Sequence, residues 1–557
     1  MSNRSWWRDA VIYQVYPRSW ADANGDGVGD LPGITSRLDH LADLGVDALW
    51  LSPFYVSPQN DAGYDVADFR DVDPLFGTLE DFDALVERAH DLGLRVVVDV
   101  VPNHSSSAHP WFAAALASPP GSPERARYVF RDGRGPDGAE PPNNWESNFG
   151  GPAWTRVTEA DGTPGQWYLH LFDPTQPDFD WTHPEVREEL ESVLRFWFDR
   201  GVDGFRIDVA HGLIKADGLP DADLTLDKHR DRTGALPMWD QPGVHEIYRS
   251  WRRLADSYPG ERMLCGEAWV EPAEALARYV RPDELHQTFN FSFLLTPWDA
   301  GALRASVDRS LASAGAVGAP QTWVLSNHDV VRHATRLGRA DATRTVVTEG
   351  IGPDDPQPDP VLGLRRARAA TTLMLALPGS AYLYQGEELG LPDATRLPEH
   401  VLQDPTWERS SRTRRGRDGC RVPVPWEPSG PSLGFGPAEP WLPQPAEYAE
   451  LVPERQRGVE GSTLELYRLL LRVRRDLALG AGTLAWREDP PARDVLDAVV
   501  TAPDGRRLQV RVNTGSGSVA RPEGELLVAS GPLPPGEVPA DTAVWVLLSE
   551  DAGDAEG

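Results

Sequence analysis

The chain is poor in cysteine, in lysine and in long apolar runs. Its 557 residues include two cysteines, Cys265 and Cys420, and two lysines, Lys215 and Lys228. Two cysteines cannot build a disulfide framework or a metal site made of cysteines alone. No stretch has the apolar length of a membrane span, and the first residues lack the apolar core of a secretory signal. These absences predict a soluble, cytoplasmic protein.

Positive charge is also scarce. The chain has 54 basic and 85 acidic residues, which gives a formal net charge of −31 at pH 7. Such a surface repels nucleic acid and anionic membranes, so neither is expected as a partner. It suits an enzyme with a small neutral substrate. Composition leaves the oligomeric state open between a monomer and a small homo-oligomer.

What the chain does contain is a regular alternation of short apolar runs and amphipathic segments. Eight strand candidates lie at 11–16, 48–51, 96–100, 204–207, 263–265, 288–291, 322–325 and 381–384. Between them, segments such as 34–44 are apolar at every third or fourth position, which is typical of a helix with one buried face. This order predicts an α/β protein, a (β/α)₈ TIM barrel of parallel strands.

Two segments depart from the alternation. Residues 105–180 are rich in Pro, Gly, Asn and aromatic residues and have no long amphipathic period, so we interpret them as a loop-rich inserted domain. Beyond residue 480, short alternating strands separated by turns predict a small antiparallel β domain. The predicted organisation is a barrel made of 1–104 and 181–480, an insertion at 105–180, and a C-terminal β domain at 481–557.

Carboxylates follow several of the predicted strands. Asp208 ends the run GFRID, Glu267 ends MLCGE, and Asp329 ends WVLSNHD; a fourth run, at 96–104, contains Asp99 and ends at His104. One acid at a strand end is usually a helix N-cap. Several acids at strand ends, in the order of the barrel strands, predict an active site, because the C-terminal ends of barrel strands meet at the catalytic face.

These strings resemble the ordered signature regions of the α-amylase superfamily, glycoside hydrolase family 13. The string at 10–19 (AVIYQVYPRS) is similar to the first strand of that superfamily. The strings at 60–65 (NDAGYD) and 416–423 (GRDGCRVP) resemble its α-glucosidase and oligo-1,6-glucosidase branch. The resemblance covers nearly the whole chain, and it implies a TIM barrel with a B domain at the insertion.

The resemblance implies roles for the acids. Asp208 would be the nucleophile, Glu267 the general acid/base, and Asp329 the residue that holds sugar hydroxyls and supports the transition state. Glycosidic cleavage needs a proton for the leaving oxygen and stabilisation of an oxocarbenium-like centre, which two carboxylates can supply. Arg206 lies on the same side of its strand as Asp208, where it would lower the pKa of that carboxyl. The alternative is that these residues are strand-end caps and structural ion pairs.

The resemblance also implies a set of substrate-binding residues, each within a matched string: Asp61, Tyr64, His104, Arg206, His328, Arg332 and Arg421. In exo-acting α-glucosidases the acid at the position of Asp61 pairs with an arginine from the later loop, which we expect to be Arg421. That pair would close the pocket behind the non-reducing glucose. Arg332 is expected at the entrance or the wall of a subsite.

The segment 22–30 (DANGDGVGD) has the spacing of a calcium loop. Side-chain oxygens stand at positions one, three, five and nine, with a backbone carbonyl at position seven and a glycine at position six. The expected ligands are Asp22, Asn24, Asp26, Val28 and Asp30. Position twelve is Gly33 rather than Glu, so the segment is not an EF-hand. We expect a structural Ca²⁺ (or Mg²⁺) and no organic cofactor; the alternative is a series of Asx turns without an ion.

The implied function is a retaining, exo-acting α-glucosidase that releases glucose from maltose and short α-glucosides. Val209, directly after the nucleophile, is typical of α-1,6-acting members, whereas the following AHGL at 210–213 favours maltose. A transglucosylase, a sucrose- or trehalose-type isomerase and an oligo-1,6-glucosidase remain as alternatives. The least favoured alternative is a non-catalytic amylase-like protein, because such relatives lack the acids and carry a membrane span.

Overall fold

The central element of the computed structural model is an eight-stranded parallel sheet. The structure describes residues 5–225, 236–340 and 344–549. The sheet order is β11-β10-β9-β5-β2-β1-β13-β12. The bounds are β1 (Val11–Val15), β2 (Ala48–Leu51), β5 (Arg95–Val100), β9 (Gly204–Ile207), β10 (Met263–Gly266), β11 (Gln287–Thr288), β12 (Thr322–Val324) and β13 (Ser380–Tyr384). Asn290 N donates to Thr322 O at 3.1 Å and links the two end strands, so the sheet closes into a barrel.

Helices cover the outside of the barrel. The longer ones are α3 (Leu79–Asp91), α6 (Pro184–Asp199), α7 (Val244–Asp256), α10 (Ala300–Ala316), α13 (Pro360–Ala376) and α16 (Thr463–Asp476). The strands are buried along nearly their whole length, as parallel strands covered by helices are. The (β/α)₈ barrel predicted from the apolar runs is therefore present.

One predicted strand is largely wrong. The run at 288–291 contributes only Thr288 to β11, and the chain then turns into α9 (Phe291–Leu294). The Asn290 side chain accepts a hydrogen bond from Phe293 N at 3.0 Å and caps this helix. The N-cap ends the strand early, because a capped first turn satisfies backbone donors that a longer strand would have paired.

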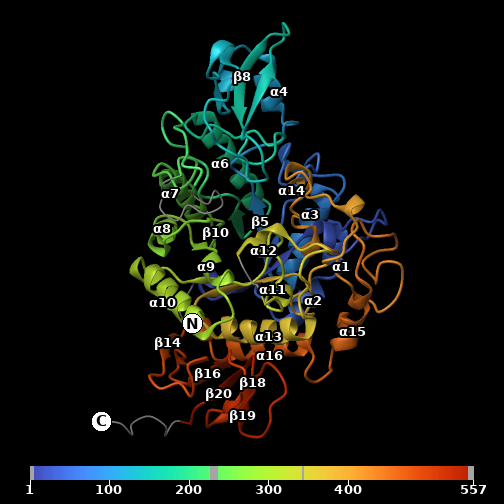
Figure 1. Ribbon diagram of the computed structural model, residues 1–557, viewed down its shortest axis with the longest axis vertical. Coiled ribbons are helices and arrows are strands. Elements are labelled where there is room, and N and C mark those ends of the chain that lie inside the picture. The colour runs from blue at the N-terminus through green and yellow to red at the C-terminus, as the bar shows by residue number, and fades with distance from the viewer. Residues whose placement is uncertain (1–4, 226–235, 341–343, 550–557) are drawn as a thin grey trace.

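The segment between β5 and α6 projects from one end of the barrel (Figure 1). It contains α4 (Pro110–Ala117), α5 (Pro123–Ala126) and a three-stranded sheet of β6 (Phe130–Arg131), β8 (Pro164–Leu169) and β7 (Trp154–Thr158). An isolated β-bridge joins His104 to Asp178, and so holds the beginning and the end of the segment together.

A five-stranded antiparallel sheet lies at the opposite end of the molecule (Figure 1). Its order is β14 (Thr483–Trp486), β15 (Val495–Thr501), β16 (Arg507–Asn513), β20 (Thr542–Leu547) and β18 (Glu525–Ala529). It packs on α13 and α16, where Trp545 Nε1 donates to Thr372 O at 3.0 Å. Among the described helices, none combines the length and apolar character needed to cross a membrane.

Candidate active site

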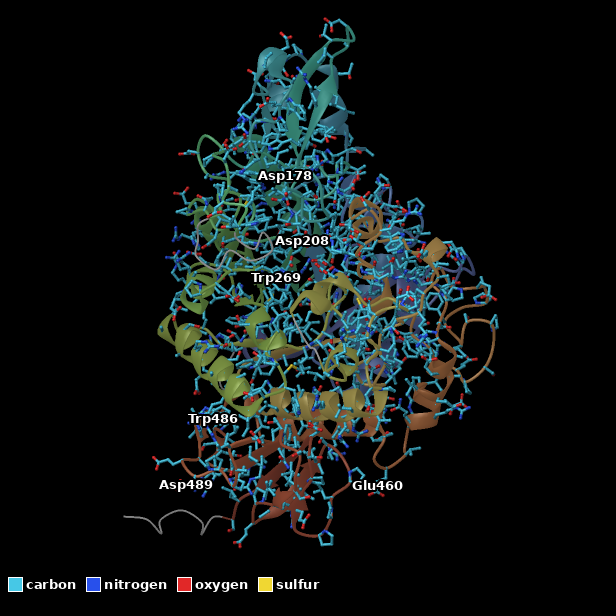
Figure 2. All side chains as sticks on the ribbon, viewed as in Figure 1. Asp178, Asp208, Trp269, Glu460, Trp486 and Asp489 are labelled. Atoms are coloured by element: carbon cyan, nitrogen blue, oxygen red, sulfur yellow. The ribbon has the colours of Figure 1, made fainter. Side chains whose placement is uncertain are left out.

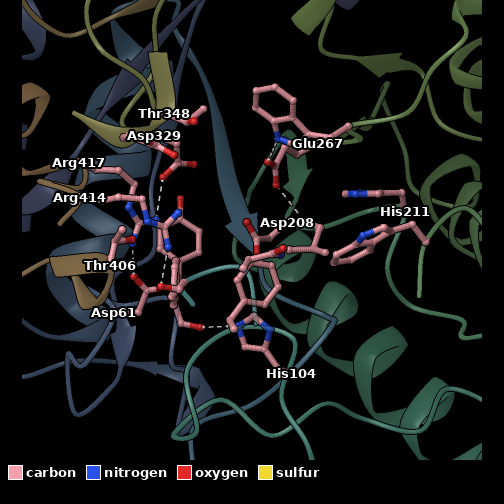
Figure 3. A pocket seen from close by; sticks show the side chains of 18 of the residues that line it. Asp61, His104, Asp208, His211, Glu267, Asp329, Thr348, Thr406, Arg414 and Arg417 are labelled. Carbon is pink, nitrogen blue, oxygen red and sulfur yellow. Dashed lines mark hydrogen bonds and ion pairs between the residues drawn. The ribbon is translucent and has the colours of Figure 1, made fainter. Parts of the chain in front are cut away.

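A pocket opens at the C-terminal ends of the barrel strands, where the insertion meets the barrel. Figure 3 shows Asp61, Arg417 and Asp329 on one side of it, Glu267 and His211 on the other, and Asp208 between them. The lining residues are Asp61, Tyr64, His104, Asn148, Phe149, Phe172, Asp208, Val209, His211, Trp239, Glu267, Trp269, Leu295, Asp329, Thr348, Glu349, Thr406, Arg414 and Arg417. The pocket thus gathers acids from distant parts of the chain.

Arg206 forms the base of the acidic cluster. Its Nη1 lies 2.9 Å from Asp99 Oδ1 and 2.7 Å from Asp208 Oδ1, and its Nη2 lies 3.0 Å from Glu267 Oε2. Strand register explains this convergence, because Arg206 on β9 is level with Asp99 on β5. Arg206 and Asp208 stand two residues apart, so their side chains leave the strand on the same side.

Glu267 is held by three donors. Besides Arg206, Trp269 Nε1 donates to its Oε1 at 2.8 Å and the backbone N–H of Val209 donates to its Oε2 at 3.0 Å. Val209 has φ = 45°, a left-handed conformation that β-branched residues rarely adopt. Strain of this kind concentrates at functional sites, and here it coincides with the backbone N–H that meets Glu267.

Burial governs protonation in this cluster. It raises the pKa of Asp208 above the ordinary range, while Arg206 opposes the shift and Glu267 adds to it. Burial also raises the pKa of Asp99 to about 7, again against the charge of Arg206. Burial therefore favours the protonated forms of Asp208 and Asp99, and Arg206 is the charge that favours their ionised forms, which a nucleophilic carboxylate needs.

Asp329 has the opposite environment. Burial raises its pKa, but His328, Arg417 and Arg421 outweigh burial and hold the pKa well below the ordinary range. Arg417 Nη1 and Arg421 Nη2 lie 3.1 and 3.0 Å from its Oδ1, and His328 Nε2 lies 3.2 Å from its Oδ2. Asp329 is therefore a fixed negative charge, suited to accept hydrogen bonds from sugar hydroxyls.

The arginine that pairs with Asp61 is Arg417, so the prediction of Arg421 is wrong. Arg417 Nη2 lies 2.6 Å from Asp61 Oδ1, and its Nε lies 2.5 Å from Asp404 Oδ2. A short 3₁₀ turn at Asp418–Cys420 places Arg417 before it and Arg421 after it. Arg421 instead lies behind the pocket, where it contacts Asp329 and the His328 carbonyl.

Arg332 is also not where it was expected. It is buried, is absent from the pocket lining, and donates to the carbonyls of Gln385 at 2.7 Å and Cys420 at 2.9 Å. A guanidinium has five N–H donors in a planar fork. Here they link two loops that are not paired with each other as strands of a sheet. Its contacts support the loop that carries Arg417 and Arg421, and it contributes no atom to the wall of the pocket.

The remaining predicted residues surround the acids. The Tyr64 hydroxyl donates to Asp99 Oδ2 at 2.9 Å, and its ring stacks on His328 with centroids 5.2 Å apart and planes 6° apart. Tyr64 and His104 line the pocket, whereas His328 lies beneath Tyr64. The predicted residues are thus brought together, with Arg332 and Arg421 displaced behind the pocket surface.

Several lining residues were missed from sequence. Aromatic residues come from the insertion, from the loop after β9 and from the loop after β10, and polar ones come from α12 (Arg344–Glu349), from α14 (Pro405–Arg409) and from the loop after α14: Phe172, Trp239, Trp269, Thr348, Glu349, Thr406 and Arg414. Arg417 stood inside a matched string, but two arginines four residues apart give no signal of which one reaches Asp61. Phe149 lies under Arg417, with 5.1 Å between the guanidinium carbon and the ring centroid.

The calcium-type loop uses its acidic side chains on its own backbone. Asp22 accepts from Gly25 N at 2.6 Å and Gly27 N at 3.0 Å, and Asp30 Oδ1 caps the following helix through Gly33 N at 2.6 Å. Across residues 5–225, 236–340 and 344–549, no group of three or more His, Cys, Asp or Glu side chains is arranged to hold a metal ion. The arrangement fits Asx turns, and the bound ion stays a prediction.

The fold and the cluster of acids define a glycoside hydrolase built on a TIM barrel. Residues 14–482 match the family model described as alpha amylase, catalytic domain, and the chain belongs to that family. It is 39% identical over 505 residues to a probable alpha-glucosidase of Rhizobium meliloti (strain 1021), covering 87% of this chain and 86% of that protein.

Two further comparisons place the chain within the family. It is 34% identical over 523 residues to an oligo-1,6-glucosidase of Parageobacillus thermoglucosidasius, covering 87% of each chain. Among solved structures, an alpha-glucosyl transfer enzyme superposes with a TM-score of 0.84 at 37% identity, covering 98% of this chain and 100% of that one. The expected α-glucosidase and oligo-1,6-glucosidase branch is confirmed.

Proposed function

We propose that the protein is a retaining, exo-acting α-glucosidase that removes glucose from the non-reducing end of maltose and short α-glucosides. One observation carries the proposal: a single guanidinium, Arg206, binds both Asp208 and Glu267 at the base of the pocket. A bridge of this kind holds the two carboxyls close together, and a close pair is the arrangement that leads to retention of configuration.

In the first step, Asp208 Oδ attacks the anomeric carbon of the bound glucose as the bond to the glycosidic oxygen breaks. Glu267, in its protonated form, gives its proton to the departing oxygen, so the leaving sugar departs as an alcohol. The product is a covalent glucosyl ester on Asp208. Asp329, kept ionised by its basic neighbours, accepts hydrogen bonds from hydroxyls of the same glucose.

In the second step, Glu267 is a carboxylate and takes a proton from water. The water oxygen attacks the anomeric carbon, the ester bond to Asp208 breaks, and glucose leaves with its original configuration. Asp208 and Glu267 regain their starting protonation states. Arg206 stabilises whichever of the two carboxyls carries the negative charge at each stage.

The contact between Asp61 and Arg417 supports exo action. Asp61 and the side chain of Arg417 are nearly buried, and both line the pocket beside Asp329. An ion pair across this end leaves no passage for a chain that continues beyond the non-reducing glucose. An endo-acting enzyme needs an open cleft at the same place, so we infer release of one glucose at a time.

Transfer of glucose to another sugar is the second candidate. The similarity to an alpha-glucosyl transfer enzyme over the whole chain favours it. Hydrolysis and transfer share the first step and differ in whether water or a sugar hydroxyl takes the glucosyl group. Among linkages, we propose α-1,4 with tolerance of α-1,6.

Initial rates on maltose, isomaltose, sucrose and trehalose, each with analysis of products, test the proposal. We expect maltose to give the highest kcat/KM and glucose to be the main product. Trisaccharides that accumulate at low substrate concentration would favour the transferase. Activity on none of the four sugars, with intact folding, would refute the proposed function.

A further inference from the structure

A buried lysine lies just outside the active-site pocket, and no catalytic step uses it. Two of the 54 basic residues are lysines; Lys228 is outside the described residues, and Lys215 lies in the loop after β9 with a side chain 5% exposed. Its Nζ donates to Asn103 Oδ1 at 2.9 Å and lies 2.8 Å from Asp178 Oδ2. A compact ammonium fits between two single oxygens, whereas a guanidinium is a wider, planar fork.

Lys215 and Asp178 fix the orientation of the Asn103 amide. An ammonium can only donate, so the atom of Asn103 that faces it must be the carbonyl oxygen. The amide nitrogen then faces Asp178 Oδ2, to which it donates at 3.1 Å. A flipped amide would set its NH₂ group against the ammonium and its oxygen against the carboxylate. Both contacts would be repulsive in this buried place, so only one orientation is stable.

The fixed amide in turn selects the tautomer of His104. Asn103 Nδ2 lies 3.2 Å from His104 Nδ1, so its second N–H donates to that nitrogen. Burial lowers the pKa of His104 to about 4, so the ring is neutral at pH 7 and has one N–H. With Nδ1 accepting, the proton must be on Nε2, which lies 3.1 Å from its acceptor, the Tyr64 carbonyl.

One contact opposes this tautomer. Gln176 Nε2 lies 3.2 Å from His104 Nε2, and Gln176 also donates to Asp61 Oδ2 at 3.1 Å. With the proton on Nδ1 instead, His104 Nε2 would accept a hydrogen bond from Gln176. However, the Nδ1–H would then face the N–H of Asn103, and the unprotonated Nε2 would face the Tyr64 carbonyl oxygen. The first tautomer makes two favourable contacts and the reverse tautomer makes one. The proton is therefore on Nε2, the ring nitrogen on the side of Asp61.

We propose that Lys215 is a positioning residue that, through Asp178 and Asn103, fixes the tautomer of His104 so that its Nε2–H is donated to the Tyr64 carbonyl, which holds together two residues that line the pocket beside Asp61. Figure 2 shows Asp178, near the end of the insertion, above Asp208, so the relay crosses the junction of the insertion and the barrel. The inference rests on the proposed function in one respect: it takes the ligand of the pocket that Tyr64 and His104 line to be an α-glucoside.

Nitrogen-15 NMR of the full chain, labelled in the histidine rings, tests the proposal directly, because the two ring nitrogens differ in shift when only one carries a proton. His104→Gln identifies the His104 signals by their loss. We expect the proton on Nε2 in the wild type. Asn103→Asp replaces the donor by an acceptor and should move the proton to Nδ1. A wild-type proton on Nδ1, or an unchanged tautomer in Asn103→Asp, would overturn the relay.

Lys215→Met tests the lysine itself. The substitution should allow both orientations of the Asn103 amide and so populate both tautomers of His104. An unchanged Nε2–H signal would overturn the role of Lys215. Since this variant leaves Asp178 buried and unpaired, Lys215→Met/Asp178→Asn is the second variant, and the same result is expected. Arg511→Met, which breaks the buried Arg511–Asp497 pair of the C-terminal sheet, is the matched control and should leave the tautomer unchanged.

Kinetics give an independent readout. Loss of the hydrogen bond between His104 and Tyr64, both of which line the pocket, should raise the KM for an aryl α-glucoside about five- to tenfold in the double variant, with kcat nearly unchanged. An unchanged KM in a variant with mixed tautomers would contradict the proposal. If the wild type did not cleave the glucoside, the proposed function would fail, while the NMR result would still decide the tautomer.

Discussion

The two sides of the pocket are positioned by different means. Asp208 and Glu267 directly follow β9 and β10, which pair residue by residue from Gly204 with Met263 to Ile207 with Gly266. Asp61 and Arg417 are 356 residues apart and stand in loops, where the ion pair itself joins them. The sheet can hold the position of an acid whose charge is removed, whereas the loop side depends on its charges.

Charge balance differs between the two sides as well. At the strand ends, three carboxyls share Arg206, and burial raises the pKa values of Asp208 and Asp99. At the loop side, His328, Arg417 and Arg421 surround Asp329 and keep it ionised. Burial therefore favours the protonated form of the carboxyls at the strand ends, whereas Asp329 on the loop side is a fixed negative charge suited to sugar hydroxyls.

Loss of the nucleophile should have the largest effect. Asp208→Asn is expected to lower kcat on an aryl α-glucoside about 10⁴-fold or more, because no covalent ester can form. Thermal unfolding should change little, since the sheet positions residue 208 and Arg206 keeps two other carboxyl partners. Near-normal turnover in a folded variant would refute the assignment.

The general acid should show a dependence on the leaving group. Glu267→Gln is expected to lose about 10²- to 10⁴-fold on maltose and far less on a dinitrophenyl α-glucoside in the first step, because a good leaving group needs no proton. Stopped-flow measurement of dinitrophenol release isolates that step. Equal losses on both substrates would argue against the acid role.

The loop side should show coupling between its charges. Arg417→Met is expected to lower kcat/KM for maltose by the equivalent of about 2–5 kcal/mol, mostly through KM, because it leaves Asp61 buried without its ion-pair partner. Asp61→Asn is expected to lose less, because Arg417 keeps Asp404 and Asp329 as partners. The double variant should lose less than the sum of the two singles. Strictly additive losses would show that the pair does not act as a unit.

A matched control lies in the same loop. Arg412 pairs with Glu408 one helical turn away, and both side chains are more than half exposed. Arg412→Met should leave KM and kcat unchanged, because exposed pairs contribute little. A loss in this variant comparable to that of Arg417→Met would show that loop disorder, rather than the ion pair, accounts for the loop-side results.

The calcium-type loop should show the smallest effect. If the loop binds Ca²⁺, as its ligand spacing predicts, millimolar calcium should raise the unfolding temperature by about 2–4 °C over a chelated sample. Asp26→Ala should abolish the difference, and kcat should be unchanged because no step uses the ion. Equal unfolding temperatures with and without calcium would favour a loop held by its Asx turns alone.

Strand ends were predictable from the sequence because apolar runs and the acids after them are local signals. The run at 204–207 and its acid Asp208 are found as predicted. The loop side was not predictable to the residue, since the choice between Arg417 and Arg421 depends on how a 3₁₀ turn faces Asp61. The aromatic walls at Phe172 and Trp239 were missed, because aromatic residues in loops are as often local core.

The stereochemistry of the first product tests the central claim most directly. Proton NMR of an aryl α-glucoside reaction, recorded within the first minutes, distinguishes the two anomers of glucose before they interconvert. Attack by Asp208 followed by attack of water inverts the anomeric carbon twice, so α-glucose should appear first and β-glucose only as mutarotation proceeds. Initial release of β-glucose would contradict the covalent mechanism and the close pairing of Asp208 with Glu267.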